Sequence, residues 1–267
     1  MARMEHGRRM CFKIKTRGHR KGVVYMIAVC VSGIAGAEHE KVIELQRKVF
    51  GEHDFFFQQW EGYPKPNVPN CLQTPEPKWD YHCMEDVKVK PDCDIFRRYT
   101  EKPNGKMYRK QKLYKQFWHS ANQQVAHYHL VKSLPEKYKT IIRLRFDTLV
   151  STRVDFKPYL ELAKEGWVIG FNTGQASGGN PTPIHKFEEQ AHDAPGCPWR
   201  IWDHIQFHPR DRLPDVEALK ERHELNGSEW GWYQLFVHES GNMKYKNVFG
   251  GESIVKWTQQ PLQWDKF

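Results

Sequence analysis

The sequence lacks the long apolar runs, paired cysteines and nucleotide-binding loops that mark many common protein classes. No hydrophobic stretch approaches the ~20 residues that a membrane-spanning helix requires. No secretory signal is visible in the first residues. The six cysteines form no C-x-x-C pair and match no zinc-binding spacing. We therefore expect a cytoplasmic protein with reduced thiols, in which Cys30 is buried in an apolar strand.

Several catalytic motifs are also missing. The chain contains no G-x-x-x-x-G-K-[ST], G-x-G-x-x-G, G-x-S-x-G or H-E-x-x-H pattern. Their absence argues against P-loop nucleotidases, dinucleotide-dependent oxidoreductases, hydrolases with a nucleophile elbow and zinc proteases.

Positive charge is concentrated in residues 1–25. The net charge is +9, and this segment holds eight Lys and Arg residues against Glu5, so the other 242 residues carry only +2. We expect residues 1–25 to be a disordered arm, or the product of an upstream start codon, ahead of a folded unit spanning 26–267. A basic arm can bind nucleic acid, which makes nucleic acid a candidate partner through residues 1–25.

The body of the chain alternates between strand and helix patterns. The apolar run at 23–32 predicts a buried strand, 38–50 an amphipathic helix, and 54–60 a second strand. This β–α–β order favours an α/β fold, with a mostly parallel sheet flanked by helices in a single domain. The later predicted elements are strands at 140–150, 167–171, 199–208 and 253–255, and helices at 107–134, 154–165, 213–223 and 228–239.

The strand at 140–150 carries the strongest candidate site. It ends with Asp147 next to two arginines, Arg143 and Arg145, and ligands of open α/β sheets bind at the carboxyl ends of strands. Asp147 could hold Mg²⁺ or Mn²⁺, while the arginines would bind a diphosphate. The alternative is an internal Arg–Asp pair that only closes a loop.

Two further residues are candidates. His208, in the polar segment 203–211, is a candidate metal or phosphate ligand, or an ordinary histidine on an edge strand. Glu229 begins a helix among aromatic residues, where a raised pKa would suit a general base. Alternatively, Glu229 is there only because acidic residues favour helix N-termini.

Three segments together resemble a known enzyme family. IAVCVSG, QFWHSANQQVAHY and KTIIRLRFDTLV are similar to small GT-A-type glycosyltransferases of the bacterial polysaccharide-synthesis, large-virus and phage kind, over residues 26–256. Those have the patterns I-A-V-x-x-S-G and Y-D-x-x-[IV]-R-x-R-[FYP]-D. The resemblance implies a GT-A-like (Rossmann-like) fold and transfer of a hexose or pentose from a nucleotide-sugar donor to a glycan hydroxyl.

The resemblance also implies roles for individual residues. Ser32 and Gly33 would lie beneath the nucleotide, and Asp147 would stand for the metal-binding aspartate. Glu229 would face the acceptor. A second aspartate next to Asp147 is missing, so either a metal or the two arginines could carry the diphosphate charge. A DNA base as acceptor and a non-catalytic nucleotide- or glycan-binding module remain the alternatives.

Overall fold

The computed structural model describes part of the chain. The described residues are 26–36, 38–77, 121–172, 188–190, 201, 203–221, 228–241, 244–249 and 254–256. The predicted basic arm at 1–25 lies outside them, so the division of the chain at residue 25 stays a prediction.

The described residues contain ten strands. They are β1 (Met26–Ser32), β2 (Asp54–Trp60), β3 (Cys71–Thr74), β4 (Tyr138–Arg145), β5 (Thr148–Val150), β6 (Val168–Asn172), β7 (Glu188–Gln190), β8 (Ile205–Pro209), β9 (Tyr245–Phe249) and β10 (Ile254–Lys256). The helices are α1 (His39–Phe50), a helix over 121–133, α4 (Lys157–Lys164), η2 (Arg210–Arg212), α5 (Val216–Glu221), α6 (Ser228–Tyr233) and the π-helix η3 (Gln234–Glu239). No described helix is long and apolar enough to cross a membrane.

Eight strands form one mixed sheet in the order β3-β2-β1-β4-β8-β6-β9-β7. Strands β3, β2, β1 and β4 are mutually parallel, as are β6 and β9, whereas β8 runs antiparallel to both of its neighbours. The prediction of an α/β fold with a mostly parallel sheet is confirmed. Strands β5 and β10 pair separately as a small antiparallel sheet.

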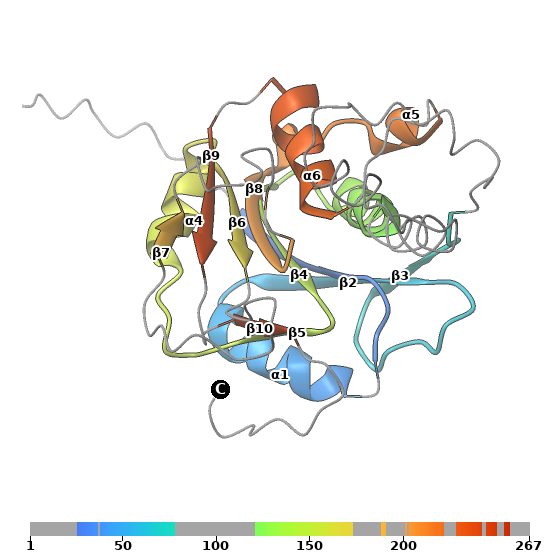
Figure 1. Cartoon of the computed structure of the whole chain (residues 1–267). Coiled ribbons are helices and arrows are strands. Elements are labelled where there is room, and N and C mark those ends of the chain that lie inside the picture. The colour runs from blue at the N-terminus through green and yellow to red at the C-terminus, as the bar shows by residue number, and fades with distance from the viewer. Residues whose placement is uncertain are drawn as a thin grey trace, which may run out of the picture.

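Helices cover both faces of the large sheet (Figure 1). Helices α1 and α4 pack on the face that holds Val29, Val31 and Leu144. The helix over 121–133 packs on the opposite face against Ala28 and Cys30, and α5 and α6 join it there through a second cluster. Strand β1 is therefore buried on both sides, which explains its unbroken apolar sequence. Cys30 is a buried free thiol, as predicted.

Three sequence-based assignments need correction. The predicted strand at 140–150 is two strands, β4 and β5, which belong to different sheets and are separated by a turn at Phe146 and Asp147. The strand predicted at 199–208 begins only at Ile205 and runs antiparallel to β4. The helix predicted at 228–239 changes from an α-helix to a π-helix at Gln234. Strands β3, β7 and β9 were not predicted.

Candidate active site at the carboxyl end of the sheet

The candidate site lies where β1, β2 and β4 end. Because these strands are parallel, their last residues meet at one end of the sheet, which we call its carboxyl end. Ser32 of β1 is the register partner of both Gln58 on β2 and Arg145 on β4, so the three side chains share one face. The turn after β1 begins with Gly33, whose φ of +120° favours glycine.

Arg145 joins two carboxylates. Its Nε and Nη2 donate to the two carboxylate oxygens of Asp147 at 2.8 and 2.7 Å, and its Nη1 donates to Asp203 Oδ2 at 3.2 Å. The three side chains are 13%, 29% and 11% exposed, respectively. Burial alone would lower the pKa of Arg145, but Asp203 and Asp147 outweigh it and raise the pKa above its usual range. Asp147 is thus the outermost member of a fixed ion-pair cluster.

Two glutamines hold the backbone around this cluster. Gln46 of α1 is buried, and its Nε2 donates to the carbonyls of Arg145 and Thr148 at 2.8 and 2.9 Å. These carbonyls flank Asp147, so α1 fixes the turn that carries the carboxylate. Gln59 of β2 accepts from the Ala35 amide at 2.9 Å and fixes the turn after β1.

Two buried polar atoms near the cluster have no hydrogen-bond partner within the described part of the chain. Ser32 is only 1% exposed, and its Oγ is unpaired, as is Oε1 of the buried Gln58. An unpaired buried polar atom is costly, and such atoms in a native protein call for an explanation. A polar ligand bound at the carboxyl end of the sheet would provide one.

Arg143 lies deeper than Arg145 and has no exposed surface. Its Nη1 donates to the Asp203 carbonyl at 2.5 Å and its Nη2 to Gln123 Oε1 at 3.0 Å, and its guanidinium carbon lies 4.3 Å from the ring centroid of Trp232. Burial lowers the pKa of Arg143 to about 9, although Asp203 acts in the opposite direction. Arg143 remains charged at neutral pH but is closed off from solvent, and its Nε has no hydrogen-bond partner among the described residues.

His208 is also fully buried, and both of its ring nitrogens have partners. Its Nε2 lies 2.8 Å from His127 Nε2, and its Nδ1 lies 2.9 Å from the Pro209 carbonyl. Because a carbonyl only accepts, Nδ1 carries the proton and Nε2 accepts one from His127. Burial lowers the pKa of His208 to about 4 and that of His127 well below its usual range. The structure does not bring His208 to Asp147, and its ring nitrogens are not free for a metal.

Glu229 is the second residue of α6. Its side chain lies outside the description, so its predicted role stays a prediction. The ring of Trp232, one helical turn later, lies against the Arg143 guanidinium of β4.

The charge balance of the cluster limits what it can bind. Arg143 and Arg145 supply two positive charges, and Asp147 and Asp203 supply two negative charges, so the four groups together are neutral. No three described His, Cys, Asp or Glu residues form a group that could hold a metal ion. Each carboxylate oxygen of Asp147 keeps a lone pair beyond its bond to Arg145. The metal role of Asp147 stays a prediction, because both of its carboxylate oxygens already accept hydrogen bonds from Arg145.

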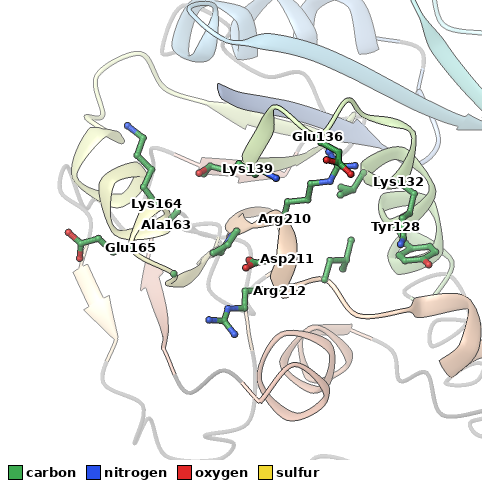
Figure 2. A pocket seen from close by; sticks show the side chains of 15 residues that line it. Tyr128, Lys132, Glu136, Lys139, Ala163, Lys164, Glu165, Arg210, Asp211 and Arg212 are labelled. Atoms are coloured by element: carbon green, nitrogen blue, oxygen red, sulfur yellow. The ribbon is translucent and has the colours of Figure 1, made fainter. Parts of the chain in front are cut away.

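A cleft lies elsewhere, at the amino end of β4 (Figure 2). It has a volume of about 740 Å³. Tyr128 and Lys132 lie on one side of it, Lys164 and Glu165 lie on the other, and Arg210 to Arg212 lie between them. Its basic and acidic side chains are mixed, and Arg210 is already bound to the carbonyls of Leu134 and Pro135. The aspartate cluster and this cleft are at opposite ends of β4.

Sequence reasoning missed Gln46, Gln59, His127 and Trp232 and assigned no role to Asp203. Asp203 alone had a signal, because it begins the polar segment 203–211. The others are polar or aromatic residues inside amphipathic patterns, where only the tertiary structure shows what they contact.

Comparisons with known proteins do not assign the chain to a family. No family model matches it, and neither does any curated protein sequence. Among solved structures, it is similar to 4-diphosphocytidyl-2C-methyl-D-erythritol synthase from Anaerococcus prevotii, with 14% identity, a TM-score of 0.43, and coverage of 88% of this chain and 93% of that chain. It is also similar to mouse xyloside xylosyltransferase 1, with 10% identity, a TM-score of 0.35 and coverage of 83% of each chain. At these scores, neither likeness carries an argument about function.

Proposed function

We propose that the protein is a glycosyltransferase that moves a hexose or pentose from a nucleotide-sugar donor to a hydroxyl of a glycan acceptor. The observation that carries this proposal is the Arg145-linked pair of aspartates, Asp147 and Asp203, at the carboxyl end of the sheet beside the Gly33 turn. The resemblance of the segments around Ser32 and Asp147 to GT-A-type enzymes supports it independently.

Ser32 and Gly33 would contact the donor nucleotide. The unpaired Ser32 Oγ and Gln58 Oε1 offer hydrogen bonds to such a ligand. The positive φ of Gly33 favours glycine, and because glycine has no side chain, the turn leaves room where the donor would approach.

A metal ion held by the two aspartates, rather than the two arginines, would neutralise the negative charge of the diphosphate. The sequence left open whether Arg143 and Arg145 neutralise the leaving group themselves. Arg143 is buried and the charge of Arg145 is balanced by two carboxylates, so neither supplies unused positive charge. Asp147 and Asp203 would therefore hold a Mn²⁺ or Mg²⁺ ion, which neutralises diphosphate charge when bound.

The proposed reaction is a substitution at the anomeric carbon. The oxygen of an acceptor hydroxyl attacks this carbon, and the bond from the carbon to the diphosphate oxygen breaks. The electron pair of that bond leaves with the nucleoside diphosphate. Glu229 accepts the hydroxyl proton as general base.

Two measurements test this function. A thermal-shift screen of nucleoside diphosphates with Mn²⁺ should identify one that raises the Tm. The matching nucleotide sugar should then be consumed with release of that diphosphate, and EDTA should abolish the reaction. Diphosphate binding without any turnover would indicate the non-catalytic module instead.

Asp147→Asn tests the site itself. It keeps the side-chain volume but removes the charge, so turnover should fall on the order of 10²–10³-fold, as for other preorganised electrostatic groups. Asp211→Asn is the matched control, because Asp211 lines the distant cleft. Full activity in Asp147→Asn would contradict the assignment.

The alternative of a nucleic-acid acceptor has its own test. If the basic arm recruits nucleic acid, the protein should bind DNA in a salt-dependent way, and deletion of residues 1–25 should remove this binding.

A further inference from the structure

We propose that Arg143 is a positioning residue that fixes the acceptor-side helix α6 against the aspartate cluster. The inference rests on the proposed function and changes the role that the sequence predicted for Arg143. Instead of contacting the diphosphate, this guanidinium joins three segments that are distant in the sequence.

The contacts of Arg143 define these three segments. Its two terminal nitrogens donate to the Asp203 carbonyl, in the segment before β8, and to Gln123, in the helix over 121–133. Its flat face lies 4.3 Å from the ring centroid of Trp232 in α6. One side chain thus sets the mutual positions of the aspartate segment and two helices.

Burial makes this arrangement costly. A buried charge can often be replaced by an apolar residue of similar volume without loss of stability. The methionine or leucine that would fill this space could not make two directed hydrogen bonds and a cation–π contact. We infer that the guanidinium is present for the geometry that it imposes.

Aromatic packing carries this geometry along the helix. The Trp232 ring stacks on the Phe236 ring, with centroids 5.6 Å apart and an interplanar angle of 17°. The ring centroids of Phe236 and His208 are 4.6 Å apart. Between Trp232 and Phe236 the helix changes to the π-form, a rare geometry that is frequent at functional sites. Glu229 lies one turn before Trp232, so the position of Trp232 determines where the start of α6 meets the site.

Substitutions at Arg143 separate positioning from direct phosphate binding. Arg143→Lys keeps the charge but loses the planar fork and the stacking. If Arg143 positions α6, then both Arg143→Lys and Arg143→Met should lower kcat on the order of 10²-fold, because small displacements of reacting groups have effects of this size. Affinity for the nucleoside diphosphate should fall by less than about tenfold, since Arg145 still holds the Asp203 carboxylate when the backbone of 203–205 loosens.

Two further variants complete the test. Trp232→Phe keeps Arg143 and weakens the stacking, so it should show the same kcat loss in milder form even if the Arg143 variants fail to fold. Arg47→Met is the matched control, because Arg47 lies over Phe55 on the other face of the sheet. It should leave kcat unchanged.

Hydrogen–deuterium exchange provides a readout that needs no substrate. In Arg143→Met, exchange should rise in 228–239 and 203–205, and Arg47→Met should leave both segments unchanged. The inference is overturned by unchanged exchange in 228–239, by unchanged kcat, or by a loss of diphosphate affinity of about tenfold or more (about 1.4 kcal/mol). If the wild-type protein binds no nucleoside diphosphate, the proposed function fails, whereas the exchange result still decides whether Arg143 positions α6.

Discussion

The two ends of strand β4 differ in what they offer a ligand. The amino end, near Thr140, opens on the cleft of about 740 Å³, whereas the carboxyl end, at Arg145, holds the linked aspartates. Five residues of extended chain separate these positions by roughly 16 Å. In the cleft, charged groups are many but do not converge, whereas at the carboxyl end a few groups are held in fixed relation. Side chains that converge and are held by their neighbours are a better guide to function than the presence of a cleft.

Removing one arginine from each end should give the largest contrast. Arg145→Met leaves two mostly buried carboxylates without their partner and should lower the free energy of unfolding by about 3 kcal/mol. Arg212→Met should change it by less than about 0.5 kcal/mol, because Arg212 makes no hydrogen bond or ion pair with the described residues. Urea denaturation of both variants checks the contrast, and equal effects would show that the cluster is no more tightly built than the cleft.

Low pH should destabilise the protein through the buried pair His127 and His208, which lies between the two ends of β4. The pKa of His208 is about 4 in the folded protein against an ordinary value of 6.5, so the unfolded chain binds more protons between these values. Stability should therefore be constant above about pH 6.5 and fall below it, by about 2 kcal/mol at pH 5 from His208 alone.

Urea denaturation at pH 7 and pH 5 measures this loss. His208→Gln should reduce the pH dependence, and His127 should retain a part of it, since its pKa is shifted in the same direction. The control is His129→Gln, because the His129 side chain is 35% exposed and pairs with Glu217. An unchanged slope in His208→Gln would mean that other groups cause the acid effect.

Alanine substitutions at two glycines, one at each end of β4, should give the smallest difference between the two ends. Gly33 at the carboxyl end and Gly166 at the cleft have φ values of +120° and +97°, and a Cβ atom at either would meet open space. Each substitution by alanine should therefore cost about 1–2 kcal/mol through backbone strain alone. Only Gly33→Ala should also weaken nucleoside diphosphate binding, which titration calorimetry would show. Equal binding losses in both variants would remove the distinction between the two ends.

The sequence was sufficient for the parts that depend on periodicity. The apolar run of β1, the helical face of α1 and the alternation of strand and helix predicted the α/β class because burial imposes these patterns directly. Arg143 and Arg145 were also correctly placed on one face of β4 by their spacing of two. This spacing could not show how deeply each arginine is buried, because the helix over 121–133 and α6 cover Arg143 completely.

Tertiary contacts account for the rest. The turn at Asp147 has neither proline nor glycine to mark it, and it exists because Gln46 binds the carbonyls on both sides. The link between Asp147 and Asp203 spans more than fifty residues and depends on the antiparallel course of β8. The metal role predicted for His208 depended on its place in a polar segment, where a buried partner such as His127 leaves no local signal.

The pairing of β5 with β10 has a consequence for biosynthesis. The strand that begins one residue after Asp147 is completed by Ile254–Lys256, more than a hundred residues later. A nascent chain on the ribosome can form β1, α1 and β2 early, but it cannot close the small sheet behind Asp147 until almost all of the protein has been translated. A polypeptide released before residue 254 would therefore lack the strand that pairs with β5, and the segment directly after Asp147 would depend on Gln46 of α1 for its support.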